Sequence, residues 1–112
     1  MFPKPLMAAT ITPLMLALLA RGESYGYQII QHIHRLSDGK IRWTASTLYP
    51  VLHRLETKGL IIATWRDSES GRKRKYYRLT AAGQQALETE KRQWLDAHAL
   101  LLKVWGPTLS PA

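Results

Sequence analysis

The sequence contains no cysteine, no long apolar run and half as many acidic as basic residues, and these shortages exclude several classes of protein. Without cysteine there is no disulfide framework, no thiolate nucleophile and no cysteine-type zinc site. The longest apolar stretch, residues 11–20, is broken by Thr12 and Pro13 and is shorter than the roughly 20 residues that span a bilayer. No secretory leader is recognisable at the start, so we expect a cytoplasmic protein without a membrane partner.

The charge that is present is concentrated in the middle of the chain. Of 112 residues, 46% are apolar, which suffices for one core, and sixteen basic against eight acidic side chains give a net charge of +8. Residues 40–78 hold ten basic and three acidic side chains (+7), whereas residues 1–39 carry +1 and residues 79–112 are neutral. Such a field attracts a polyanion, most commonly nucleic acid, although a basic patch alone does not distinguish DNA, RNA, an anionic membrane or a merely solvated face.

Two helices are predicted in the first third of the chain. Apolar residues at i, i+3, i+4, i+7 and i+8 from Ile11 form one helical stripe. Thr12 suits the cap of this helix, Pro13 its first turn, and the arginine and glycine at residues 21–22 its end. A second helix is predicted over residues 24–36, with the serine at its start as the cap.

The third helix is placed by its proline. A proline is tolerated in the first turn of a helix but not deep inside it, because early positions have few hydrogen-bonded amides. With Ser46 as the cap, Pro50 is the fourth helical residue, whereas a cap at Thr44 would bury the proline a further half-turn in. We therefore predict a helix over residues 47–58. Its outer face is polar and comprises Ser46, Pro50, His53 and Thr57, flanked by Thr47, Tyr49 and Arg54.

The periodicity then changes to that of strands. Residues 60–67 and 75–79 are rich in Ile, Thr, Trp and Tyr and predict a β-hairpin, with residues 68–74 as a turn with a basic tip. Residues 40–43 are too short for a helix and predict one short strand. A last helix starts at a Thr80 cap and carries apolar residues every seven positions before the stop at Gly106-Pro107.

Three helices followed by a hairpin with a basic tip is the element order of a winged helix. We therefore predict a mainly α fold with a small β-hairpin, the wing. A winged helix-turn-helix DNA-binding domain should occupy residues 1–79, and a long C-terminal dimerisation helix and tail residues 80–112, the two forming one compact unit.

In a winged helix the third helix enters the major groove of DNA and the hairpin lies along the backbone or minor groove. Thr47 and Tyr49 are placed to donate to phosphates, whereas His53 and Arg54 could reach base edges. The basic wing should add salt-sensitive attraction that does not depend on sequence. The predicted DNA-contacting residues are Tyr25, Ser46, Thr47, Tyr49, Pro50, His53, Arg54, Arg72, Lys73, Arg74 and Lys75.

Several of these residues have an alternative role. Tyr49 could instead pack its ring on the second helix with its hydroxyl in water. His53 could simply be solvated. Lys75 and Arg78 lie on a strand, so at least one of them should point away from DNA.

Three motifs resemble one known family. They are YGYQI at residues 25–29, TLYPVLHRLETKGLI at residues 47–61 and GRKRKYYRLTAAG at residues 71–83. In order and spacing they closely resemble the PadR family of bacterial transcriptional regulators, over about residues 11–95. The resemblance implies a winged-helix repressor that dimerises through its C-terminal helix and binds a palindromic operator, without a cofactor. The single C-terminal helix resembles the short branch of the family. Ser46 is a departure, since many relatives have glycine there, but either residue caps a helix.

The last helix predicts a homodimer independently of the resemblance, because its stripe is too apolar to leave in water. Two-fold symmetry would match a palindrome with half-sites about one helical turn apart. The predicted dimer interface comprises Leu14, Leu18, Leu87, Leu95, Leu101, Leu102 and Trp105.

Trp94 is the predicted ligand-binding residue. In short-branch relatives a tryptophan near this place faces a cavity between subunits and stacks on flat ligands, which implies a small aromatic effector. The alternative is that Trp94 only packs in the dimer core. The effector could be a phenolic acid, a planar drug or nothing.

Catalysis and metal binding are not expected. His32 and His34 diverge by about 200° on a helix and cannot ligate one metal together. No Ser/His/Asp order, carboxylate pair or phosphate-cradling glycine loop is present. The remaining alternative is a winged-helix interaction module that binds nucleic acid non-specifically or a protein partner.

Overall fold

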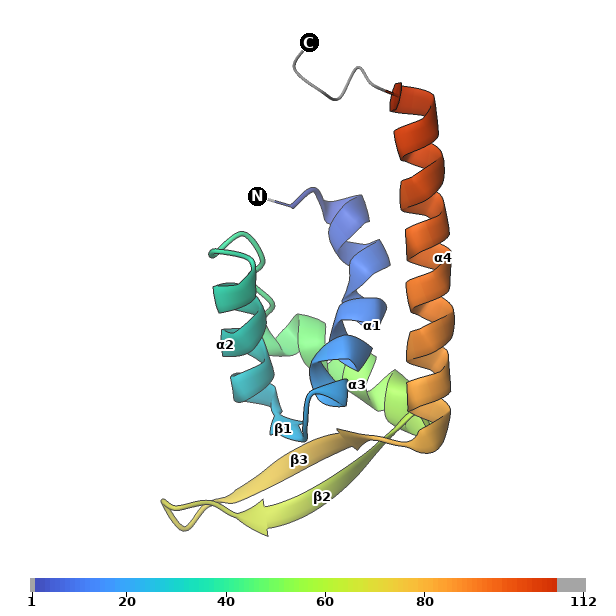
Figure 1. The fold of residues 1–112 in the computed structure, drawn as a ribbon. Helices are drawn as coiled ribbons and strands as arrows, with labels where there is room; N and C mark the ends of the chain where they lie inside the picture. Colours follow the sequence, from blue (N-terminus) through green and yellow to red (C-terminus); the bar gives the residue numbers. More distant parts are fainter. Residues whose placement is uncertain (1, 107–112) are drawn as a thin grey trace.

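The computed structural model describes residues 2–106 and confirms a mainly helical winged helix-turn-helix followed by one long helix (Figure 1). Three helices and a three-stranded antiparallel sheet of order β1-β3-β2 precede the last helix. The elements are α1 (Lys4–Ala20), β1 (Ser24–Tyr25), α2 (Gly26–Leu36), α3 (Ala45–Thr57), β2 (Ile61–Asp67), β3 (Lys73–Leu79) and α4 (Ala81–Trp105).

Helix α1 begins earlier than the sequence predicts. Its N-cap is Pro3, and Thr12 and Pro13 lie inside the helix, so the predicted cap at Thr12 is wrong. Pro5 sits in the first turn, where a missing amide hydrogen costs nothing. Pro13 removes one internal hydrogen bond, but α1 buries apolar side chains on both sides of it, from Ile11 to Leu19, and this packing keeps the helix continuous.

The strand that joins the hairpin is β1, not the segment predicted to be a strand. Ser24 pairs with Tyr77 instead of capping α2, and its hydroxyl donates to Gln28 Oε1 at 2.8 Å. Residues 40–43 are irregular, although Ile41 and Trp43 are buried and alternate with exposed neighbours. Residues 40–43 show the alternating burial of a strand but pair with none, because both edges of β3 are already paired, one with β1 and the other with β2.

The predicted cap of α3 at Ser46 is also wrong. The Thr44 side chain caps the helix by accepting from the Thr47 amide at 3.3 Å, and its hydroxyl also bonds that of Ser46 at 2.9 Å. Pro50 is therefore the sixth helical residue and deprives the Ser46 carbonyl of its partner. Both residues are exposed, so water can hydrate that carbonyl. The proline therefore destabilises the helix less on this exposed face than it would at a buried position.

The wing is longer and its turn shorter than predicted. Strands β2 and β3 pair from Ile61↔Leu79 to Asp67↔Lys73, which leaves only residues 68–72 for the turn. Side chains alternate between the two faces of the wing. The inner face, turned toward the helices, carries Ile61, Ala63, Trp65, Asp67, Lys73, Lys75, Tyr77 and Leu79. The outer face carries Ile62, Thr64, Arg66, Arg74, Tyr76 and Arg78.

The base of the wing is joined directly to α4. The predicted cap at Thr80 is confirmed, since its side chain accepts from the Gly83 amide at 3.0 Å. The Thr80 hydroxyl donates to the Gly59 carbonyl at 2.7 Å, and its amide donates to the Leu60 carbonyl at 3.1 Å. A Cβ on Gly83 would overlap the Leu60 carbonyl oxygen, so only glycine permits this close contact.

Helix α4 runs antiparallel beside α1 and continues past its N-terminal end (Figure 1). The helix ends at Trp105 with Gly106 as the C-cap, whereas the predicted stop at Pro107 lies outside the described residues.

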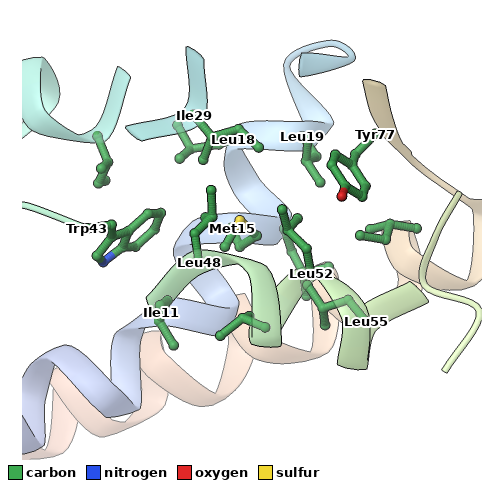
Figure 2. Close-up of a cluster of buried hydrophobic side chains, with 14 of the residues drawn as sticks. Ile11, Met15, Leu18, Leu19, Ile29, Trp43, Leu48, Leu52, Leu55 and Tyr77 are labelled. Carbon is green, nitrogen blue, oxygen red and sulfur yellow. The ribbon is translucent and has the colours of Figure 1, made fainter. Parts of the chain in front are cut away.

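All three of the first helices and the sheet contribute to one core, with Met15 of α1 near its centre, between Trp43 and Tyr77 (Figure 2). Helix α3 contributes one stripe to it, and α4 contributes mainly Leu87. The buried residues are Ile11, Met15, Leu16, Leu18, Leu19, Ile29, Ile33, Ile41, Trp43, Leu48, Val51, Leu52, Leu55, Ile61, Tyr77 and Leu87.

Candidate nucleic-acid interface

The surface of α3 is divided into a central face and two flanks. Ser46, Pro50, His53 and Thr57 are exposed at the centre, opposite the buried stripe. The Thr57 hydroxyl donates to the His53 carbonyl at 2.9 Å, so the Thr57 side chain is fixed by a hydrogen bond within its own helix. The central face is polar and carries no acid, which suits an approach to the edge of a DNA groove.

Tyr49 lies on the flank of α3 that meets the start of α2. A Cβ at Gly26 would overlap the Tyr49 hydroxyl, so the ring tip lies directly on the Gly26 backbone. The side chain nevertheless keeps 47% of its surface exposed. The ring therefore packs on α2 while part of it stays accessible, which combines features of both roles considered for Tyr49.

Tyr25 joins the wing to the start of α2, because β1 pairs with β3 and is followed directly by Gly26. Its ring contacts Tyr76 edge-on, with the centroids 5.4 Å apart, and the Arg74 guanidinium lies 4.3 Å above it. Tyr25 and Arg74 lie on the outer face of the sheet, whereas Tyr49 contacts Gly26, the residue that follows Tyr25. The structure thus brings together two of the predicted DNA contacts, Tyr25 and Arg74, that are 49 positions apart in the sequence, and places Tyr49 on the residue next to Tyr25.

The outer face of the wing contains a residue that the sequence analysis did not single out. Arg66 is directly opposite Arg74, a like-charge pair that ordinarily destabilises a sheet. Each arginine lies on its own tyrosine ring, Arg66 at 4.0 Å from Tyr76, and Arg66 also forms an ion pair with Glu23. No local pattern marks Arg66 or Glu23, because their partners depend on the long-range pairing of β1 with β3.

The inner face of the wing is tied to the end of α3. Lys75 Nζ lies 3.6 Å from Glu56 Oε1, 5.6 Å from the Tyr77 ring centre and 6.0 Å from that of Trp65. Lys75 therefore points toward α3, whereas Arg78 is on the outer face and exposed. Arg72 and Lys73 are exposed at the tip. Arg74 and Lys75 thus have partners within the chain, while Arg72 and Lys73 extend into solvent.

Tyr77 lies beneath this interface. Burial first, and then the nearby Tyr49 and Glu56, together raise the pKa of its phenol from 10.0 to about 12. The phenol stays neutral at physiological pH. Its ring therefore supports Tyr49 and Lys75 without adding charge.

Arg54 lies on the other flank of α3, away from Tyr49. Together with Lys58 it lines a cleft of about 270 Å³ between α1, α3 and α4, where Glu90 and Gln93 face it. The guanidinium is exposed and can reach outward, but its neighbours include an acid of α4.

The predicted dimer residues fall into two groups. Leu18 and Leu87 are buried within their own chain and offer almost no surface to a partner. Leu14 is partly buried. Exposed apolar residues instead occupy the outer half of α4, residues 94–105, and include Leu95, Leu101, Leu102 and Trp105.

Trp94 lines a cleft of about 890 Å³ between α1, α2 and α4. Most of the other side chains around it are apolar, among them Phe2, Leu14, Leu36 and Leu95. Trp94 keeps 37% of its surface exposed, so the indole is accessible from the cleft.

The described part of the chain offers no metal site, since no three His, Cys, Asp or Glu side chains between residues 2 and 106 are grouped to hold an ion. None of the helices in that range is long and apolar enough to cross a lipid bilayer.

Comparison with known proteins gives consistent results. Residues 15–89 match the model of the transcriptional regulator PadR-like family. The chain is 42% identical to the transcriptional regulator Rv3488 of Mycobacterium tuberculosis over 65 residues, which is 58% of this chain and 53% of that protein. A PadR family transcriptional regulator from Eggerthella lenta is similar in structure, with a TM-score of 0.73 at 36% identity over 96% of this chain and 88% of the other. A transcriptional regulator from Clostridium thermocellum gives a TM-score of 0.81 at 28% identity over 89% and 97%.

Proposed function

The chain belongs to the PadR-like family of transcriptional regulators and is not an enzyme, and we propose that it is a repressor that binds a palindromic DNA operator as a homodimer. The observation that carries this proposal is that the basic wing is held beside α3, by the Lys75–Glu56 ion pair at 3.6 Å, next to the polar face of that helix. This arrangement presents a helix and a basic wing side by side, as duplex DNA requires.

We assign the DNA contacts by position. The central face of α3, with Ser46, Pro50 and His53, enters the major groove, and Arg54 reaches base edges or phosphates on its flank. Thr47, Tyr49 and Tyr25 contact the backbone beside the groove. The wing cations contact phosphates of the next segment, chiefly through Arg72 and Lys73, while Arg74 and Lys75 hold the wing in place and add positive field.

The homodimer is supported by the outer half of α4. Leu95, Leu101, Leu102 and Trp105 leave an apolar surface on a segment that extends past α1. A second copy that packs its own α4 and the partly buried Leu14 region there would remove this surface from water. A two-fold dimer then presents two α3 helices to two half-sites.

An aromatic effector is supported by the cleft at Trp94. A volume of about 890 Å³ lies within the range of about 300–1,000 Å³ typical of small-molecule sites. An indole accessible from an apolar cleft favours a flat aromatic ligand, which would stack on the ring. Because the cleft lies beside the proposed dimer surface, such a ligand would act on the subunit arrangement and release the operator.

The first experiment is selection of binding sites from a randomised duplex library at about 0.15 M salt. A recovered palindrome with half-sites about ten base pairs apart would support the dimeric regulator. Binding without a consensus, fading as salt rises, would favour the alternative of a non-specific interaction module.

Repression and release need a second experiment. Transcription in vitro from a promoter that carries the recovered operator should fall on addition of the protein, and activation instead would contradict the repressor role. Planar aromatic compounds should quench tryptophan fluorescence in the parent and in a Trp65→Phe control, but not in Trp94→Ala. Equal quenching in Trp94→Ala would place the ligand site elsewhere.

A further inference from the structure

Trp65 is exposed although it lies in the middle of a paired strand. It sits on the inner face of the wing, where Ile61 and Tyr77 are buried against the helices, yet 62% of its own surface is exposed. The reason is its position along the strand, since the wing extends beyond the core (Figure 1). A large indole left in water contributes little to folding and is a candidate for a contact with another molecule.

The surroundings of Trp65 are charged. Its cross-strand partner is Lys75, which the Glu56 carboxylate holds against the end of α3. The next pair toward the tip on the same face is Asp67↔Lys73. Trp65 therefore lies between the end of α3 and the basic tip of the wing. Lys75 is its nearest cation on the side of α3, and Lys73 is the nearest on its face toward the tip.

The indole is also less covered than the other aromatic rings of the wing. Guanidinium groups lie 4.0 Å from the Tyr76 ring and 4.3 Å from the Tyr25 ring. The Lys75 ammonium is 6.0 Å from the Trp65 ring centre, at the outer limit of a cation–π contact. The outer face of the wing thus has its rings occupied by its own arginines, whereas the inner face leaves one ring open.

We propose that Trp65 is a DNA contact whose indole packs on the deoxyribose of the backbone strand that passes between α3 and the wing. Lys73 binds the adjacent phosphate. The inference rests on the proposed function and deepens it, because it adds an apolar contact to a wing that would otherwise bind by charge alone. A sugar–phosphate backbone matches this site, since it alternates apolar rings with anionic groups. The cross-strand partner of Trp65 is a lysine and the next pair on its face is Asp67↔Lys73, a charged setting that favours nucleic acid over an apolar protein surface.

The test compares three variants on the selected operator over a range of salt concentrations. Trp65→Thr keeps a residue suited to a strand and should weaken binding about tenfold at every salt concentration, leaving the slope against salt unchanged because no phosphate contact is lost. Lys73→Ala should lower that slope by about one. Ile62→Ala is the matched control, since Ile62 lies on the same strand with 43% exposure but on the outer face, and it should stay within about twofold of the parent.

A second readout guards against an indirect effect on folding. In the parent, saturating operator should shift tryptophan emission to shorter wavelength as Trp65 leaves water, and Trp65→Phe should lack that shift while remaining folded and bound. Unchanged operator affinity in Trp65→Thr, or an undiminished emission shift in Trp65→Phe, would overturn the inference alone. If the parent binds no duplex, the proposed function itself is overturned and the inference with it.

Discussion

The wing and the outer half of α4 both extend beyond the core, but, apart from Ile62 and Trp65, the exposed side chains of the wing are mostly charged, whereas those of α4 are mostly apolar. The wing presents Arg66, Arg72, Lys73 and Arg78 to solvent. The outer half of α4 presents leucines, valine and tryptophan. Solvated charge is stable in water, so the wing can hold its shape without a partner, whereas an apolar helix face is costly until it is covered. This difference is what the proposed function requires, a wing that releases DNA readily and an α4 that stays bound to a second subunit.

The largest effect is expected at the junction at Thr80 and Gly83, where the base of the wing and the start of α4 are held together. Gly83→Ala places a Cβ against the Leu60 carbonyl oxygen, a backbone atom that cannot move aside cheaply. We expect the free energy of unfolding to fall by about 2–3 kcal/mol, measured by chemical denaturation. Ala82→Ser changes the exposed neighbouring residue and serves as the control, with an expected change below about 0.5 kcal/mol. Equal stability of the two variants would mean that the junction is not tight.

The apolar side of the comparison is tested by charging α4. Leu95→Glu with Leu101→Glu should convert the proposed dimer to a monomer in sedimentation experiments and weaken operator binding on the order of 10²-fold, because two half-sites are no longer bound together. Leu100→Glu is the matched control, since Leu100 is 62% exposed on the opposite side of the helix and should leave the dimer intact. A double variant that remains dimeric would place the interface elsewhere.

The charged side of the comparison predicts a smaller effect that is the same for all sequences. Arg72→Ala should weaken binding about fivefold at ~0.15 M salt, for operator and random duplex alike, and lower the salt slope by about one. Fluorescence anisotropy titrations at several salt concentrations measure both quantities. An unchanged slope would remove Arg72 from the DNA contacts. The oligomeric state of the Arg72→Ala variant should be that of the parent in either case.

The smallest effect concerns Tyr77, which is buried on the inner face of the wing. Because its pKa is raised to about 12 in the folded chain, the unfolded chain loses this proton first, above pH 10, and stability falls as pH rises from about 10 to 12. Tyr77→Phe should leave the melting temperature at pH 7 nearly unchanged and flatten this alkaline loss. An identical alkaline profile in the variant would mean that the phenol does not titrate in this range.

Local signals in the sequence predicted most of the elements, and the failures have a common cause. The Thr80 cap and the apolar stripes depend on neighbours a few positions away and were predicted correctly. The predicted cap of α3 is wrong because Pro50 lies on the exposed face of the helix, where the loss of one hydrogen bond is inexpensive. Strand β1 was missed because two residues carry no periodicity, and its pairing with β3 is set by the tertiary fold.

The candidate site follows the same division. The residues of α3 and of the wing tip could be predicted from charge and helical spacing, and their contact with DNA stays a prediction. Their mutual arrangement could not be predicted, because the Arg66–Glu23 pair and the contact of Arg74 with Tyr25 join positions more than forty residues apart. Likewise, Leu87 belongs to the same sequence stripe as Leu101, but only the length of α1 decides which of them is buried.

The junction at Thr80 and Gly83 makes α4 a lever. With 25 residues the helix is about 37 Å long, and no linker separates it from β3. A displacement of about 3 Å at its far end therefore corresponds to a rotation of only about 5° at the pivot beside Leu60. The base of the wing is attached at the same pivot, so in the proposed homodimer the distance between the two wings would depend on the angle at which the two α4 helices cross.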